Sequence, residues 1–136
     1  MSIKKSVYSF FLNKITMLKK PLSDPPSCTE DLMAVQDSLD ILGGKWKLLI
    51  LHYLLKRENI SNTFKKIEKD INGISAKVLS KELKDLEAHL LVKREVLNTQ
   101  PQQVQYSITE HGKSTQEIIQ VLVNWGKIHR INILKS

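Results

Sequence analysis

Hydrophobic residues recur along the first half of the compact region three or four positions apart, the spacing of one face of an α-helix. This period predicts successive helices at 27–42, at 45–56, in a short segment after Ser61 and at 75–88. Side chains that cap helix starts and glycines that end helices support these bounds. They are Ser27 and Gly43-Gly44 for the first helix, Ser61 for the third and Ser75 for the fourth.

The period then changes from helical to two, which predicts a β-hairpin. The alternating residues are Val92, Arg94 and Val96, then Val104, Tyr106 and Ile108, with the polar segment 98–102 between them. Thr109 is expected to cap a last helix at about 110–130. The predicted fold class is therefore mainly α with a small antiparallel β-hairpin. Two short helices followed by such a hairpin form the winged helix-turn-helix layout.

The fourth helix is the one that this layout inserts into a DNA major groove. Its face away from the leucines carries lysines and serines, and its first N–H groups favour a phosphate. The expected DNA contacts on this helix, about 75–88, are Ser75, Ala76, Lys77, Ser80, Lys81 and Lys84. The wing, about 91–109, adds Lys93, Arg94, Gln102 and Gln103. The alternative is a solvated face whose lysines pair with Glu82, Asp85 and Glu87 of the same helix.

Charge changes the picture at the N-terminus more than in the body. The chain has 136 residues and a formal net charge of +7, which suits a polyanion such as nucleic acid. Residues 1–27 are interpreted as a basic extension with a Pro-rich linker, and 28–136 as the DNA-binding domain. Positions 3–18 fit an amphipathic helix that packs on the body, contacts DNA or lies on a membrane surface, or else a disordered tail. No apolar run is long enough to span a membrane, so stable membrane insertion is not expected. We expect a cytoplasmic location.

Three segments resemble the HxlR-type winged helix-turn-helix regulators, a MarR-like family. They are Ile41–Leu51, which starts the family pattern, Gly73–Glu87, which is similar to its recognition helix, and Val104–Gly112, which is similar to its second wing strand. The resemblance implies a dimeric transcription factor that binds a two-fold operator and often represses a neighbouring gene. The chain departs from the family at Gln103, where many relatives have a basic residue, and at Thr29, where proline is common.

A dimer is also expected from the last helix, which is apolar around most of its circumference. Such a helix needs cover on more than one side, and in so small a domain a second subunit is the expected cover. The N-terminal helix of the same chain is the alternative. The expected dimerisation residues are Leu32, Val35, Leu39, Ile118, Leu122 and Trp125.

Cys28, the only cysteine, is a candidate redox sensor, since backbone dipoles at a helix start stabilise a thiolate. Glu30 and Asp31 oppose this effect, and an inert thiol is the alternative. The resemblance to the HxlR-type family supports this hypothesis, since some members sense oxidants, quinones or aldehydes through a cysteine at about this place. With one cysteine in the chain, a disulfide at Cys28 would join two subunits or a small thiol. A small-molecule or electrophile inducer is thus a possible partner.

No spacing of the four histidines predicts a metal site, and no catalytic motif is present. Neither a cofactor nor an enzymatic activity is therefore expected. The competing class of function is a winged-helix module that binds protein or RNA without operator DNA.

Overall fold

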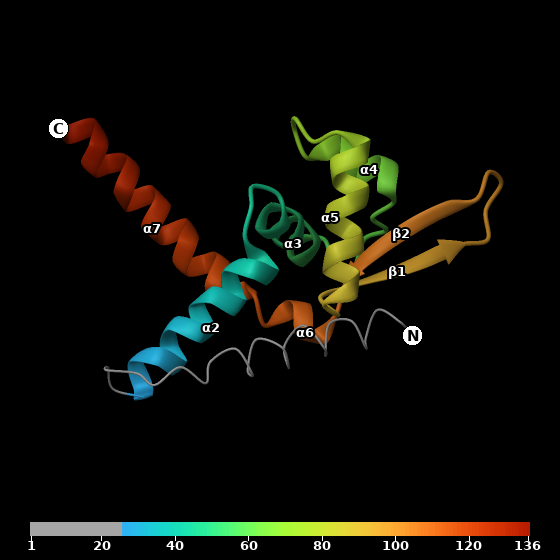
Figure 1. Ribbon diagram of the computed structural model, residues 1–136. Helices are drawn as coiled ribbons and strands as arrows, with labels where there is room; N and C mark the ends of the chain where they lie inside the picture. The colour runs from blue at the N-terminus through green and yellow to red at the C-terminus, as the bar shows by residue number, and fades with distance from the viewer. Residues whose placement is uncertain (1–25) are drawn as a thin grey trace.

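The computed structural model describes residues 26–136, with side chains from Cys28 onward. The predicted amphipathic helix at 3–18 and most of the Pro-rich linker lie outside the described residues. Six helices and one hairpin follow one another along the described part of the chain (Figure 1). They are α2 (Pro26–Leu42), α3 (Lys47–Lys56), α4 (Phe64–Asp70), α5 (Ala76–Ala88), β1 (Val92–Leu97), β2 (Gln103–Ile108), α6 (Glu110–Lys113) and α7 (Gln116–Lys135). The predicted fold class, mainly helical with one antiparallel hairpin, is confirmed.

Three of the predicted helix starts are wrong. The helix predicted for 45–56 begins at Lys47 as α3. The first helix begins at Pro26, so Ser27 lies inside α2 and not before its first residue. Proline suits the first turn of a helix because its fixed φ is already helical. The third helix begins at Phe64, and Thr63 caps it by accepting a hydrogen bond from the Lys66 N–H at 3.3 Å. The hydroxyl of Ser61, the predicted cap, donates to Gln105 Oε1 instead.

The last helix was predicted as one element and is two. Thr109 caps the four-residue helix α6 as predicted, and the chain then turns at Ser114-Thr115 before α7 begins. Buried Thr115 stabilises this break, since its hydroxyl donates to the Gly112 carbonyl at 2.7 Å. A side chain at Gly112 would overlap the Leu91 carbonyl and Ile108, so α6 packs against the base of the hairpin through bare backbone.

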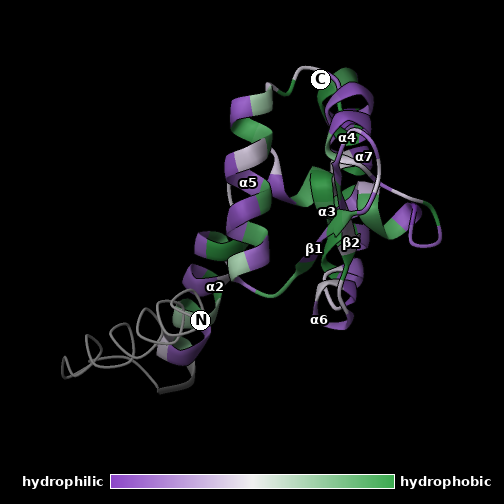
Figure 2. Cartoon of the chain, turned by 90° about the vertical axis from the view of Figure 1, so that its right-hand side faces the viewer, coloured by the Kyte–Doolittle hydropathy of each residue, from purple (hydrophilic) through white to green (hydrophobic). Residues whose placement is uncertain are grey.

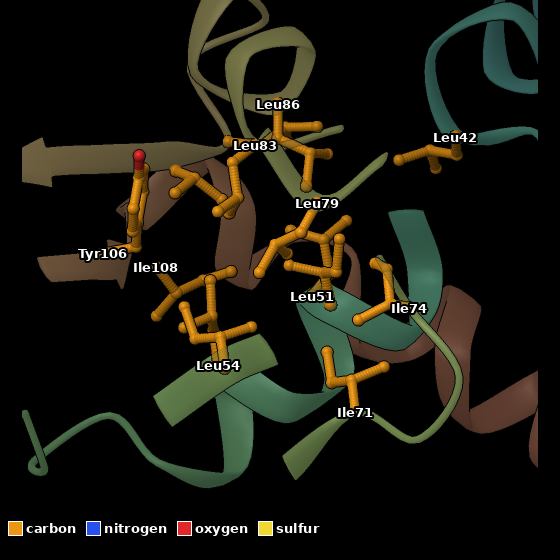
Figure 3. Close-up of a cluster of buried hydrophobic side chains, with 14 of the residues drawn as sticks. Leu42, Leu51, Leu54, Ile71, Ile74, Leu79, Leu83, Leu86, Tyr106 and Ile108 are labelled. Carbon is orange, nitrogen blue, oxygen red and sulfur yellow. The ribbon is translucent and has the colours of Figure 1, made fainter. Parts of the chain in front are cut away.

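The core lies between α3, α4, α5 and the base of the hairpin (Figure 3). Leucine and isoleucine side chains of α3 and α5 are fully buried, and Tyr106 and Ile108 of β2 close the cluster. The fully buried leucines of α5 are Leu79, Leu83 and Leu86. Burial of each such side chain contributes about 1.5–3 kcal/mol, so this face fixes how α5 is rotated about its axis.

The hairpin has a third, short partner. Its two strands pair antiparallel with Val92 opposite Ile108 and Val96 opposite Val104. The loop before α4 pairs with the outer edge of β2, where the Tyr106 N–H donates to the Asn62 carbonyl at 2.8 Å and Thr63 forms a bridge with Gln105. The wing is therefore connected to the helix-turn-helix pair twice, by the chain from α5 into β1 and by the pairing of β2 with the loop before α4.

Candidate nucleic-acid interface

Helix α5 presents a polar face to solvent because its leucines are buried and its start is capped. The Ser75 hydroxyl accepts a hydrogen bond from the Val78 N–H at 3.2 Å, as predicted for this cap. Hydrophilic and hydrophobic residues alternate along α5 in Figure 2. All ten predicted DNA contacts are exposed, with five on α5, one at its N-cap and four on the wing.

The acidic residues of α5 do not neutralise its lysines. Lys47 of α3 holds both Glu82, at 2.7 Å between Nζ and Oε2, and Asp85, at 3.5 Å between Nζ and Oδ2. The alternative in which Asp85 and Glu82 pair with lysines of their own helix is therefore wrong. Within residues 28–136, no acidic side chain forms an ion pair with a lysine on the exposed face of α5.

A groove of about 700 Å³ separates α5 and α4 from the hairpin. It brings together half of the predicted contacts, which are Ser80, Lys84, Arg94, Gln102 and Gln103. Lys93 does not line it, because neighbouring residues of a strand point to opposite faces. The remaining predicted residues of α5 lie outside the groove lining. Glu87 is the one carboxylate among the residues that line it.

The groove has one basic residue that the sequence analysis missed. Lys65 lies in the first turn of α4, is exposed, and lines the groove beside Thr63 and Phe64. Nothing in the local sequence distinguishes Lys65 from the other lysines of α4. Its position becomes meaningful only when the fold places α4 next to the wing.

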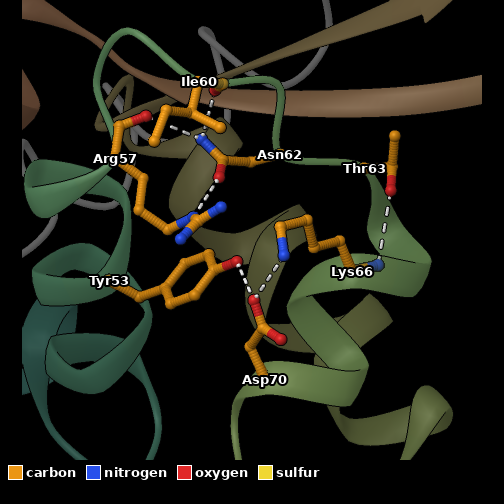
Figure 4. Close-up of polar contacts among 7 residues, drawn as sticks. All are labelled: Tyr53, Arg57, Ile60, Asn62, Thr63, Lys66 and Asp70. Carbon is orange, nitrogen blue, oxygen red and sulfur yellow. Dashed lines mark hydrogen bonds and ion pairs between the residues drawn. The ribbon is translucent and has the colours of Figure 1, made fainter.

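Asn62 connects the end of α3 to the wing (Figure 4). Its side chain is 2% exposed, donates to the carbonyls of Arg57 and Ile60 at 3.0 and 2.9 Å, and accepts from Arg57 Nε at 3.0 Å. Gln105 continues the connection, since it accepts from Ser61 and donates to Glu95 across the hairpin. These contacts set the position of the wing relative to α4 and α5.

The helices α2 and α7 extend away from the body on the side opposite the hairpin (Figure 1). The six residues predicted to form a dimer interface all lie on these helices and are exposed. Their exposed fractions are Leu32 65%, Val35 57%, Leu39 65%, Ile118 44%, Leu122 47% and Trp125 62%. Only Ile119 of α7 is buried among the described residues, so most of this apolar helix has no cover within the described chain.

Cys28 is exposed in the first turn of α2, close to where it was predicted. Residues 28–136 contain no group of three or more histidine, cysteine, aspartate or glutamate side chains placed to hold a metal ion. Within the described part of the chain, every helix is too short or too polar to cross a membrane.

Two successive helices, α4 and α5, followed by a hairpin and set on a leucine-rich core, define a winged helix-turn-helix protein. The profile of the HxlR-like helix-turn-helix family matches residues 41–132, and the chain belongs to this family. It is thus a transcriptional regulator of a DNA-binding class, and the predicted resemblance is confirmed.

Individual relatives agree with this assignment. The chain is 33% identical over 102 residues to the HTH-type transcriptional regulator YybR of Bacillus subtilis (strain 168), covering 75% of this chain and 78% of YybR. It is similar to the crystal structure of the HTH-type regulator ytcD, with a TM-score of 0.65, 34% identity, and coverage of 72% of this chain and 96% of the other. It is also similar to the redox regulator HypR in its reduced form, with a TM-score of 0.67, 29% identity, and coverage of 76% and 99%. All three relatives are named as regulators.

Proposed function

We propose that the protein is a repressor that binds a two-fold operator as a homodimer. Residues 75–88 would enter the major groove and the wing, 91–109, would contact the adjacent backbone. The observation that carries the proposal is the lysine face of α5, whose acidic neighbours Glu82 and Asp85 are held by Lys47. Unpaired lysines on an exposed helix are free to displace counterions from phosphates.

The residues that line the groove beside this face support different DNA contacts for α5 and for the wing. Lys84 and Arg94 face it from α5 and β1, and Gln102 and Gln103 from the hairpin tip. Lysine and arginine donate hydrogen bonds to phosphates or to guanine edges, while glutamine binds adenine edges or phosphates. The wing would therefore anchor through Arg94 at its base, since the tip carries amides in place of a cation.

The domain division and the dimer are part of the same proposal. Residues 28–136 would form the DNA-binding unit and 1–27 a basic extension. The exposed apolar residues of α2 and α7 support a subunit interface, because patches of this kind are unusual on a monomer. A dimer whose two copies of α5 read two half-sites matches a two-fold operator.

The first test is fluorescence anisotropy with DNA from the region upstream of the protein's own coding sequence, and with a shuffled duplex as control. Binding about a hundredfold tighter to the first duplex is expected, since specific sites exceed non-specific ones by about 10³ or more. Equal, weak binding to both duplexes, and to a panel of palindromic duplexes, would favour the interaction module for protein or RNA. Glu87 in the groove and the amide-only wing tip are the features that such a module would use.

Lys77→Ala and Lys81→Ala are each expected to weaken binding to any duplex. Each is also expected to reduce the slope of log affinity against log salt by about one unit, because one phosphate contact releases about one counterion. A contact to a base would instead relax sequence preference, at a cost of roughly 1–3 kcal/mol. The measurement is a salt titration by anisotropy, with Lys135→Ala in the last turn of α7 as the matched control. Unchanged affinity in both α5 variants would remove this face from the interface.

Cys28 is proposed to respond to oxidants or electrophiles, which an exposed thiol in the first turn of α2 allows. Diamide would take two electrons and two protons from two Cys28 thiols, which leaves an intersubunit disulfide, or would join Cys28 to a small added thiol. We expect a cross-linked dimer or a mixed disulfide by mass spectrometry, lower DNA affinity, and full reversal by dithiothreitol. Cys28→Ser should be insensitive. If wild-type Cys28 stays unmodified and DNA affinity does not change, the thiol is inert.

A further inference from the structure

A second cavity, of about 540 Å³, lies along α3, and its lining includes no residue of the groove between α5 and the hairpin and none of α2 or α7. It is lined from α3 and the residue after it by Leu49, His52, Tyr53, Lys56 and Arg57, and from the turn between α4 and α5 by Ile71 and Asn72. We infer that this cavity binds a small organic anion, a carboxylate on an apolar body about one ring in size.

The charge of the cavity favours an anion. Lys56 and Arg57 are its two cations, and none of the residues that line it is acidic. The guanidinium of Arg57 is held by its Nε–H, which donates to Asn62, and by the Tyr53 ring, whose centroid lies 5.1 Å from Cζ. Its terminal amino groups have no partner among the described residues. A guanidinium fixed in this way loses little freedom when it donates to both oxygens of a carboxylate.

Asp70, the carboxylate that is hydrogen-bonded to Tyr53 of the cavity wall, is already compensated. The Tyr53 hydroxyl donates to Asp70 Oδ2 at 2.7 Å, and Lys66 Nζ lies 3.1 Å from the same oxygen (Figure 4). These contacts, the Tyr53 hydrogen bond first, hold the pKa of Asp70 below its usual value. Burial, together with that hydrogen bond, raises the pKa of Tyr53 to about 12, so the phenol stays neutral and remains a donor to Asp70. An incoming anion would therefore be recognised by Lys56 and Arg57.

The size and the walls of the cavity favour an organic ligand over an inorganic ion. Its volume falls in the range of about 300–1,000 Å³ that is typical of small-molecule sites. Leu49, which is 49% exposed, and Ile71 supply apolar surface that a ring would cover. The half-buried imidazole of His52 adds a further polar group at the wall. One ring with one carboxylate satisfies both the apolar walls and the cations.

Such a ligand would lie close to the contacts that position the wing. Arg57 is hydrogen-bonded to Asn62, and the Asn62 carbonyl in turn accepts from the Tyr106 N–H of β2. A carboxylate on Arg57 is thus separated from the wing by two successive hydrogen bonds. The site itself is proposed independently of DNA binding.

The test is isothermal titration calorimetry of the full chain, without DNA, with benzoate, benzamide and acetate as probes. The affinity for benzoate should be about tenfold or more above that for benzamide, which lacks the charge, because charged hydrogen bonds contribute to binding. It should exceed the affinity for acetate, which lacks the ring, by a similar factor because apolar burial also contributes. Lys56→Glu should weaken benzoate by about tenfold or more, since it reverses the one exposed cation of the site. Lys69→Glu, which changes the last turn of α4 outside the cavity, is the matched control.

Lys56 has no contact with Asn62, so Lys56→Glu should keep the wild-type circular dichroism spectrum and melting temperature. Equal affinity for benzoate and benzamide would overturn the proposal, as would a Lys56→Glu protein that binds benzoate like wild type. Because no DNA is present, neither result bears on the proposed operator binding.

Discussion

Asn62→Ala is expected to lower the free energy of unfolding by about 2–4 kcal/mol, because it leaves buried polar groups without partners. The amide of Asn62 supplies the donors for the carbonyls of Arg57 and Ile60 and the acceptor for Arg57 Nε. With the side chain 2% exposed, water has little room to replace it. Urea unfolding at one fixed protein concentration measures the change, since dimerisation would make stability depend on concentration.

Two further variants isolate the cause of this loss. Asn59→Ala removes an exposed amide from the same loop and should cost less than about 0.5 kcal/mol. Asn62→Asp keeps an acceptor for Arg57 but loses both donors, so it should be destabilised as well. If Asn62→Ala is as stable as Asn59→Ala, the loop does not depend on this side chain for its position. The backbone pairing of Asn62 and Thr63 with β2 would then be sufficient to hold the loop against the wing.

The helices and the hairpin were predictable because each carries its own period. The burial of Leu79, Leu83 and Leu86 follows from their spacing, and so does the exposure of the lysines between them. The start of α4 was not predictable in the same way. Ser61 and Thr63 are both good caps by type, and only the pairing of Asn62 with Tyr106 of β2 draws Ser61 toward the wing and leaves Thr63 at the helix start.

The break between α6 and α7 has a similar origin. The segment from Thr109 to Glu117 contains neither a proline nor a hydrophobic residue, so nothing in the sequence marks a break and one helix is predicted from the Thr109 cap onward. The close approach of Gly112 to Leu91 and Ile108 fixes α6 against the hairpin, and α7 must then leave in another direction. A period reports which face of a segment is buried, but not where the rest of the fold forces the chain to turn.

At the proposed DNA interface, the exposed face of α5 was predictable from the sequence. The ion-pair partners of its acidic residues were not. Local spacing suggests that Asp85 pairs with a lysine of α5, whereas in the structure both Asp85 and Glu82 form ion pairs with Lys47 of α3. Lys65 was missed for the same reason, since α4 and the wing are neighbours only in space. Tertiary contacts thus decide which charges remain available to DNA.

Leu122→Glu is expected to convert a dimer into a monomer and to weaken operator binding by about a hundredfold or more, because one half-site alone lacks the gain of a linked second contact. Leu122 lies on one face of α7 with Ile118 and Trp125, and all three are exposed in the single chain. A buried carboxylate without a partner would oppose the packing of two such faces.

Light scattering coupled to size exclusion measures the mass, and anisotropy on the operator measures the affinity. Gln116→Glu is the matched control, since it adds the same charge to α7 about half a turn away from that face. A Leu122→Glu protein that remains dimeric would place the interface elsewhere, on α2 or on the N-terminal extension. A wild-type protein that is monomeric at micromolar concentration and on DNA would contradict the two-fold operator. The exposed apolar face of α7 would then need a different partner, while the lysine face of α5 would remain available to a single half-site.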